Sequence, residues 1–234
     1  MKRLLIADSL VVIVAALNEE QGIGPSLAEL KTVLGDPKLL VIDGNSTDKT
    51  VKIAKEMGAD VLIQDRQGKG QAISQAIGHI NSNIKYVVFI DADYTYPAEY
   101  IPEMIQILEE NHKVGMVSGN RFTNSIDLHV MNYSFYIGNM LLAMVQNLLN
   151  GLHLNDPLTG LRVVRWDILN GWKPKSKGFD IEAELNHRVE RQGYYTQEIS
   201  ISYRPRLGVK KLKLIDGLTI LKRIIMESIT RNLA

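Results

Sequence analysis

KYVVFIDAD, residues 85–93, sets an apolar run directly before two acidic residues. A short run of this kind predicts a strand that is buried on both faces of a parallel sheet and ends near Asp91. Residues i and i+2 of an extended chain point to the same side, so the carboxylates of Asp91 and Asp93 are expected to face one crevice. Mg²⁺ commonly takes one or two carboxylates and shares its other positions with phosphates and water, which makes the pair a candidate metal site. The alternative is that Asp93 caps the helix that follows.

The chain around this stretch alternates between strand and helix patterns. Apolar strands are predicted at 9–17, 38–44, 59–65, 85–93 and 113–119, and amphipathic helices at 22–34, 48–57, from 70 onward and at 97–110. This alternation is typical of βαβ crossovers and predicts an α/β fold, with a mostly parallel central sheet and helices on both faces. Ligands of such sheets bind beyond the carboxyl ends of the strands, where the polar clusters NEE, DGNSTD and DAD lie.

The second part of the chain has longer and more varied elements. We expect a helix over 133–151, a turn at NDPLTG, a strand at RVVRW, a helix over 178–193 and a strand over 194–206. One domain is expected over residues 1–234. It comprises a nucleotide-binding half at about 9–120, an acceptor half at about 121–214 and a basic amphipathic tail helix at about 215–234.

Composition narrows the possible functions. Lys and Arg total 27 against 26 Asp and Glu, a balance that argues against a nucleic-acid partner. The absence of cysteine excludes disulfides and thiolate chemistry and fits a reducing compartment, so a cytoplasmic location is expected. No apolar run reaches the ~20 residues of a membrane span. The apolar N-terminus reads as a strand rather than a signal sequence, because Asp8 interrupts it.

Several single residues are candidates for binding. Asp43 ends a predicted strand beside the first one, so we expect it to bind a nucleoside. Lys69, in GKG at 68–70, offers a charge near a diphosphate, although GKG is also an ordinary helix start. Arg121 follows a strand and suits a phosphate. Asp156 is either a turn residue or a carboxylate that faces a sugar, and Glu182 is a second candidate for the latter role.

The tail is strongly basic. Between residues 203 and 231, Lys and Arg far outnumber the two acidic residues, Asp216 and Glu227. LIDGLTILKRIIMESI, at 214–229, has one apolar and one charged face, which suits a helix lying in an anionic lipid interface. The alternative is a helix packed on the core with a solvated basic face. The apolar segment 137–152 is either core or a surface for an isoprenoid chain.

Taken in order, these motifs resemble glycosyltransferase family 2. They are most similar to its dolichol-phosphate mannose synthase-like members and related polyprenyl-phosphate sugar transferases, archaeal members included. The resemblance rests on VVIVAALNEE (11–20), VIDGNSTDKT (41–50), GKG (68–70), VVFIDADYTYPAE (87–99), SGNRF (118–122), GNMLLAMVQNLL (138–149), NDPLTGLRV (155–163), GFDIEAELNHR (178–188) and ISYRPRLGVKKL (201–212).

The resemblance implies a GT-A fold and an inverting hexosyltransferase. Its donor would be a nucleotide-diphosphate sugar of the GDP-mannose or UDP-glucose type, with Mg²⁺ or Mn²⁺ as cofactor and a polyprenyl (dolichyl) phosphate as acceptor. The enzyme would work at the cytoplasmic face of a membrane, peripherally or beside a membrane-protein partner. The alternatives are transfer to a hydroxyl acceptor, nucleotidyl transfer, or an inactive nucleotide-sugar or membrane-binding module.

The resemblance also implies roles for individual residues. Asp91 and Asp93 would bind the metal and the diphosphate, and Arg121 would meet the acceptor phosphate with help from Ser134. Asp156 and Glu182 would contact the sugar or the acceptor. The donor-binding set would be Ala16, Asn18, Glu19, Asp43, Lys69, Ala92, Arg206 and Lys211.

Three positions depart from the pattern of the family. Ala15 stands where Pro is frequent, Gly44 where a second Asp is frequent, and Lys210 where the tail motif usually has Ser. Many relatives also carry C-terminal transmembrane helices, whereas this sequence has no apolar run of that length. Peripheral binding or a membrane-protein partner is therefore expected.

Overall fold

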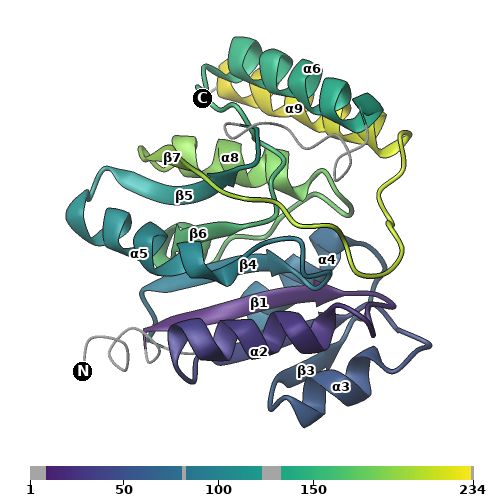
Figure 1. The fold of residues 1–234 in the computed structure, drawn as a ribbon. Helices are drawn as coiled ribbons and strands as arrows, with labels where there is room; N and C mark the ends of the chain where they lie inside the picture. The colour runs from purple at the N-terminus through teal and green to yellow at the C-terminus, as the bar shows by residue number, and fades with distance from the viewer. Residues whose placement is uncertain (1–8, 81–82, 123–132, 233–234) are drawn as a thin grey trace.

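The computed structural model describes residues 9–80, 83–122 and 133–232 (Figure 1). Within these ranges seven strands form one sheet in the order β3-β2-β1-β4-β6-β5-β7. The strands are β1 (Leu10–Ala16), β2 (Lys38–Asp43), β3 (Asp60–Ile63), β4 (Tyr86–Asp91), β5 (Val114–Asn120), β6 (Arg162–Arg165) and β7 (Tyr195–Ser200). Each lies where the sequence predicts a strand, although β7 stops well before residue 206.

The sheet is parallel except at β6. β1 pairs in parallel with β2 and β4, β2 with β3, and β5 with β7, whereas β6 runs antiparallel between β4 and β5. The register sets Ala16 opposite Asp43 and Ala15 opposite Asp91. The carboxyl ends of β1, β2 and β4 therefore lie side by side at one edge of the sheet, and the predicted mostly parallel α/β architecture is confirmed.

Helices cover both faces of the sheet. They are α2 (Ile23–Leu34), α3 (Thr50–Glu56), α4 (Lys69–His79), η1 (Ala98–Tyr100), α5 (Ile101–Glu110), α6 (Tyr133–Asn150), α7 (Trp166–Leu169), α8 (Ile181–Arg191) and α9 (Asp216–Asn232). The alternation of β1 reveals the two cores that result. Leu10, Val12 and Val14 pack with α2 and α5 on one face, while Val11 and Ile13 pack with α4 and α8 on the other.

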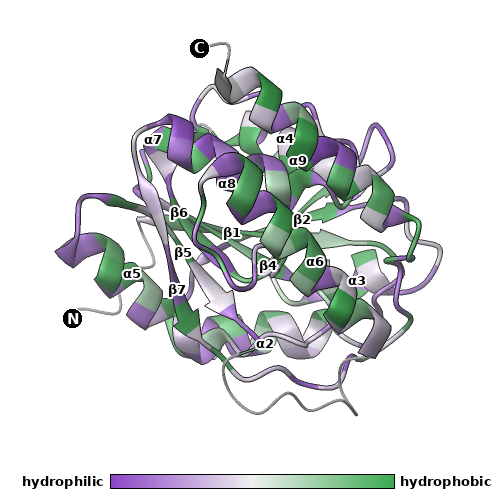
Figure 2. Cartoon of the chain, turned by 90° about the horizontal axis from the view of Figure 1, so that it is seen from above, coloured by the Kyte–Doolittle hydropathy of each residue, from purple (hydrophilic) through white to green (hydrophobic). Residues whose placement is uncertain are grey.

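Helices α6 and α9 lie against each other in a further layer beyond the sheet (Figure 1). Ile220 and Ile224 of α9 pack with Ala183 of α8 in a small separate core. Both helices carry many hydrophobic residues, as the colouring of Figure 2 shows from above, and some of these residues are exposed. The large exposed ones are Tyr133, Ile137, Met140, Leu141, Met144, Leu148 and Leu149 on α6 and Leu218, Ile225, Met226 and Ile229 on α9. Among the described helices, none is both long and apolar enough to cross a bilayer.

Arg223 of α9 forms buried ion pairs with residues of α8 and its N-terminal cap. Its Nε lies 3.1 Å from Asp180 Oδ2 and 3.8 Å from Glu184 Oε2, and its Nη1 lies 3.4 Å from Glu227 Oε1. Burial and the charge of Glu184 raise the pKa of Glu227. The tail helix thus buries one basic residue against α8 while it exposes apolar residues on its outer side. Packing on the core is confirmed for the inner face, and lipid binding by the outer face stays a prediction.

We predict that Arg223→Ala lowers the free energy of unfolding by about 3–5 kcal/mol, because removing one partner leaves buried carboxylates uncompensated. Chemical denaturation followed by circular dichroism measures the change. Lys222→Ala, at the exposed neighbouring position, is the matched control and should stay within about 0.5 kcal/mol of the parent. Equal stability of the two variants would contradict the anchoring role of Arg223.

Candidate active site

A cavity of about 810 Å³ lies at the carboxyl ends of β1, β2 and β4. Its wall also draws on α4, α6, α8 and the segment 201–215 that precedes α9. The residues singled out by the sequence that line it are Ala16, Glu19, Lys69, Asp91, Ala92, Asp93, Arg121, Ser134, Glu182, Arg206 and Lys211. Residues from both halves of the chain therefore meet at one cavity.

The turn after β4 fixes the two carboxylates. Thr95 donates to Asp93 Oδ1 from its backbone N–H, at 3.1 Å, and from its hydroxyl, at 2.6 Å. Asp93 thus bonds within the turn and does not cap the following helix. Tyr94 has a φ of 66°, a left-handed conformation that is costly for a bulky residue. A Cβ on Gly22, at the start of α2, would lie 2.5 Å from the carbonyl oxygen of Ala92, so only glycine allows α2 to pack this closely on the turn.

Lys69, at the start of α4, joins β4 to α8. Its Nζ lies 2.7 Å from Asp91 Oδ1 and 2.7 Å from Glu182 Oε1. Burial by itself would lower the pKa of Lys69, but the two carboxylates raise it well above its ordinary value. Burial would likewise raise the pKa of Asp91, and the charge of Lys69 reverses this, so the pKa of Asp91 is lowered. Both groups are therefore charged at neutral pH.

Asp93 is in a less favourable electrostatic position than Asp91. Burial and then the negative charge of Asp91 raise the pKa of Asp93, although Thr95 and Arg206 act in the opposite direction. A divalent cation beside two such carboxylates would remove this repulsion. The pair fits an ion that takes two protein ligands and completes its coordination with substrate oxygens and water. Within the described ranges, no group of three or more His, Asp or Glu side chains forms a fuller metal cage.

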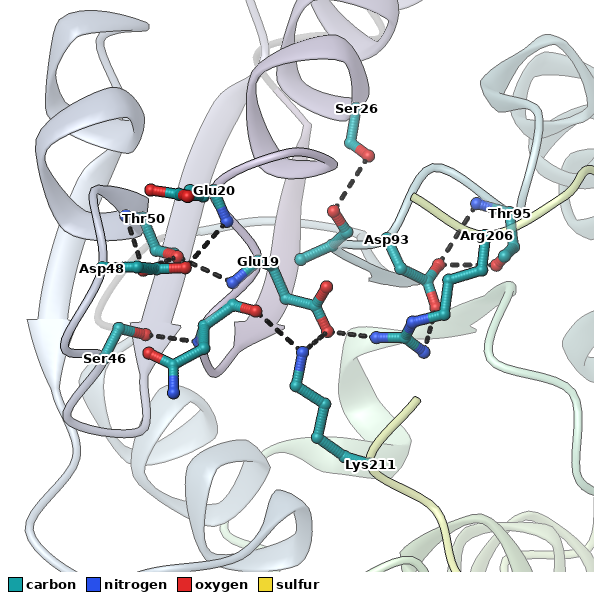
Figure 3. A network of polar contacts seen from close by, with 12 residues as sticks. Glu19, Glu20, Ser26, Ser46, Asp48, Thr50, Asp93, Thr95, Arg206 and Lys211 are labelled. Atoms are coloured by element: carbon teal, nitrogen blue, oxygen red, sulfur yellow. Dashed lines mark hydrogen bonds and ion pairs between the residues drawn. The ribbon is translucent and has the colours of Figure 1, made fainter. Parts of the chain in front are cut away.

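Glu19 holds the segment 201–215 across the site (Figure 3). Its Oε1 pairs with the guanidinium of Arg206 and lies 2.7 Å from Nζ of Lys211, which also donates to the Asn18 carbonyl at 2.8 Å. Nη1 of Arg206 lies 2.7 Å from Asp93 Oδ2. The two cations expected over the donor phosphates are thus in the cavity, where they pair with carboxylates. Nε of Arg206 is buried without a hydrogen-bond partner among the described residues.

Asp156 positions Arg121 rather than facing the cavity. It is fully buried and accepts from Nε of Arg121 at 2.6 Å, from Nη2 at 2.7 Å and from the backbone N–H at 3.1 Å. The Arg121 guanidinium also lies near the rings of Tyr96 and Tyr203, at 6.0 and 5.3 Å from their centroids. The expectation that Asp156 faces a sugar is therefore corrected, because both of its oxygens are bound to Arg121. Arg121 does line the cavity, as does Ser134 on α6.

Asn18 and Asp43 also lie outside the cavity wall. Asp43 is fully buried, and its two oxygens accept from the backbone N–H and the hydroxyl of Ser46 at 2.8 and 2.5 Å. Asn18 donates its backbone N–H to the Ser46 hydroxyl and accepts from the backbone N–H of Thr47, both at 2.8 Å. These contacts shape the turn after β2. The prediction that Asp43 binds a nucleoside is therefore corrected, because both of its oxygens are engaged, whereas nucleoside binding by the exposed Asn18 stays a prediction.

GKG forms the start of α4, and its glycines allow a neighbouring loop to approach closely. A Cβ on Gly68 would lie 2.2 Å from the Lys177 carbonyl oxygen, and one on Gly70 would lie 2.4 Å from that of Ser176. They admit the backbone of a neighbouring loop, which the sequence pattern does not reveal. Sequence reasoning also missed Tyr96, whose hydroxyl accepts from the Gly160 N–H at 2.7 Å, although this tyrosine stands in the same stretch as the two carboxylates.

Comparison with known proteins finds relatives that match most of the chain. Residues 11–169 match the family described as Glycosyl transferase family 2. The chain is 34% identical over 213 residues to the dolichyl-phosphate hexose transferase of Haloferax volcanii, which covers 90% of this chain and 89% of that protein. It is 30% identical over 200 residues to glycosyltransferase AglJ of the same organism, covering 85% of this chain and 64% of AglJ.

A solved structure has a similar fold. Glucosyl-3-phosphoglycerate synthase from Mycobacterium tuberculosis, in complex with Mn²⁺, UDP and glucosyl-3-phosphoglycerate, superposes with a TM-score of 0.71 at 22% identity. The match covers 95% of this chain and 79% of that one. At this identity the comparison establishes the shared fold and no more.

The arrangement at Glu19 yields a prediction about the segment 201–215. Glu19→Gln should accelerate amide hydrogen exchange there by about ten-fold, because hydrogen bonds to a charged group contribute about 1.5–3 kcal/mol. Exchange followed by mass spectrometry measures the effect. Glu20→Gln removes the same charge from an exposed neighbour that does not contact Arg206 or Lys211, and should leave the exchange unchanged. Identical exchange in both variants would mean that Glu19 does not hold the segment.

Proposed function

Because the chain belongs to glycosyl transferase family 2, we propose that it transfers a hexose from a nucleotide-diphosphate sugar to a polyprenyl phosphate. The donor is of the GDP-mannose or UDP-glucose type, and the acceptor is dolichyl phosphate or a similar lipid. The observation that carries the proposal is the cavity itself, whose lining combines Asp91 and Asp93, several cationic side chains and residues of the apolar helix α6. The 34% identical Haloferax protein, with its dolichyl-phosphate hexose transferase activity, supports this choice.

The donor side of the site is the region around Asp91, Asp93 and Arg206. The two carboxylates would hold Mg²⁺ or Mn²⁺, which neutralises charge on the diphosphate of the donor as it leaves. Arg206 offers a buried Nε without a described partner, and a phosphate oxygen would satisfy it. Lys69 keeps Asp91 ionised through their 2.7 Å contact and so keeps it competent as a ligand.

The state of the other carboxylates favours a phosphate acceptor. A hydroxyl acceptor needs a general base, which is worth roughly 10²–10⁴-fold in rate. The two candidates for that role are both engaged, Asp156 with Arg121 and Glu182 with Lys69. A phosphate monoester has its second pKa near ~6 and is already ionised at neutral pH, so it needs cations to position it and no base. An acceptor oxygen then bonds to the anomeric carbon while the bond to the diphosphate breaks, which inverts that carbon and releases a nucleoside diphosphate.

The outer face of α6 and α9 suits the surface of an anionic membrane. Leu148 is 80% exposed and Leu218 is 63% exposed, and exposed lysines lie close by at Lys213 and Lys222. Apolar residues flanked by cations bind lipid interfaces through burial and charge together. The cytoplasmic leaflet carries anionic lipids, so we propose peripheral binding at that face, alone or beside a membrane protein.

The transferase activity is tested directly with purified protein. We expect wild type with Mg²⁺ or Mn²⁺ to convert polyprenyl phosphate and one of GDP-mannose, UDP-glucose or UDP-N-acetylglucosamine into a glycosylated lipid phosphate and a nucleoside diphosphate. Asp91→Asn should lose at least about 100-fold in rate, as is typical when transition-state charge loses its stabilisation. Asp36→Asn, whose side chain is 92% exposed, is the matched control. Release of pyrophosphate, or transfer only to a polyprenol, would overturn the proposal.

Membrane binding is tested by co-sedimentation with vesicles. Wild type should bind phosphatidylglycerol-containing vesicles more tightly than pure phosphatidylcholine vesicles. The double variant Leu148→Ser/Leu218→Ser should weaken binding at least about ten-fold, because burying one leucine contributes about 1.5–3 kcal/mol. Ile63→Ser, an exposed apolar position on β3 at the far edge of the sheet, should bind like wild type. Equal loss in both variants would argue against the α6–α9 face.

A further inference from the structure

Lys210 enters the cavity from the segment 201–215 but points to a different wall from its neighbour Lys211. Its Nζ lies over the ring of Phe135 on α6, 3.0 Å from the ring centroid. Lys211 instead reaches Glu19 on the donor side. Lys210 lines the cavity and remains exposed, so a ligand can reach its ammonium group. Two consecutive lysines therefore serve opposite sides of one site.

The charges that face Lys210 are positive. Partial burial, followed by the charges of Arg121 at the end of β5 and Arg206 in the same segment, lowers the pKa of Lys210 to about 8. Arg121 is compensated by Asp156, and Arg206 by Glu19 and Asp93. Among the described residues, no carboxylate forms an ion pair with Lys210. Lys210 therefore carries a positive charge that no described carboxylate compensates. An anion that binds Lys210 would not have to displace a carboxylate.

We propose that Lys210 binds the terminal phosphate of the acceptor and, with Arg121, sets the preference for a phosphorylated lipid. The inference rests on the proposed function and deepens it by naming the residue that recognises the phosphate monoester. Arg121 and Asp156 together carry little net charge, because the carboxylate of Asp156 accepts two hydrogen bonds from the Arg121 guanidinium. Lys210 supplies the additional charge that a dianion needs.

The surroundings of Lys210 match a lipid phosphate better than the donor diphosphate. Ser134, Phe135 and Leu142 of α6 line the cavity on the side of Lys210, and Ser134 adds a hydroxyl there. The same helix continues outward with the exposed residues Leu141 and Met144. A phosphate seated at Lys210 would therefore have an apolar surface beside it for the first isoprene units. The donor side has its own cations in Arg206 and Lys211.

The test compares Lys210→Ser, Lys210→Arg and the control Lys52→Ser, which removes the same charge from an exposed position on α3. Steady-state rates are measured with polyprenyl phosphate and nucleotide sugar varied in turn. Lys210→Ser should raise KM for the lipid phosphate about ten- to hundred-fold and leave KM for the donor unchanged. Lys210→Arg should restore most of the loss. An unchanged acceptor KM in Lys210→Ser, or a rise in the donor KM instead, would overturn the inference.

Direct binding separates this inference from the proposed function. Calorimetric titration of farnesyl phosphate, without donor, reports on the phosphate site even if no transfer occurs. Wild type should bind farnesyl phosphate at least about ten-fold more tightly than farnesol, and Lys210→Ser should lose that difference. Binding without any sugar transfer would refute the proposed function and leave Lys210 supported, whereas equal binding by wild type and Lys210→Ser would refute Lys210 alone.

A pH profile adds a readout that a purely structural role would not change. As pH rises through about 8, Lys210 loses its proton while the lipid phosphate stays dianionic and Arg121, whose pKa lies well above its ordinary value, stays charged. The kcat/KM for the acceptor in wild type should therefore fall above about pH 8. In Lys210→Arg this fall should disappear, because guanidinium does not titrate in that range. A fall of the same size in Lys210→Arg would contradict the assignment.

Discussion

The site depends on the balance between acidic side chains crowded at one sheet edge and the cations that distant segments bring to them. Glu19, Asp91, Asp93 and Glu182 all line one cavity, and so many carboxylates in partly buried positions repel one another. Lys69 meets two of them, and Arg206 meets the other two. These ion pairs therefore connect the first residue of α4 and the segment 201–215 to the carboxylates of the site.

This balance also explains how a ligand can reorganise the site without a change of fold. Arg206 bridges Glu19 and Asp93 across the position where a donor phosphate and its cation would sit. A divalent ion at Asp91 and Asp93 would compete for the carboxylate that Arg206 now holds, and a phosphate would offer Arg206 a new partner in return. The exchange would keep every charge compensated, which limits its cost at partly buried side chains.

The sequence was sufficient for the elements of the fold and for most of the wall of the site. Runs such as KYVVFID are apolar without interruption because parallel strands are buried on both faces, and the acidic residues at their ends mark the functional edge. The antiparallel insertion of β6 between β4 and β5 was not predictable, because strand order depends on pairing between distant residues. The contacts of Asn18 and Asp156 were missed for a related reason, since their partners Ser46, Thr47 and Arg121 lie 28, 29 and 35 residues away in the sequence. Asp43 instead closes its own turn with Ser46, three residues further along the chain. A carboxylate at a strand end can face a ligand or close its own turn, and spacing does not distinguish the two.

One loop connects α9 with the residues around Asp91. Arg223 of α9 pairs with Asp180 and Glu184, and Glu184 accepts from the backbone N–H groups of Lys175 and Ser176 at 2.8 and 2.6 Å. The backbone of that loop in turn lies against Gly70, whose N–H donates to the Gly178 carbonyl at 3.1 Å. Lys69, the neighbour of Gly70, then reaches Asp91. A continuous series of hydrogen bonds and ion pairs therefore connects the helix proposed to lie on the membrane with the carboxylate proposed to hold the metal. These directional bonds act beside the apolar contacts of Ile220 and Ile224 with Ala183, and they add a geometric constraint on the position of α9 that apolar packing alone does not supply.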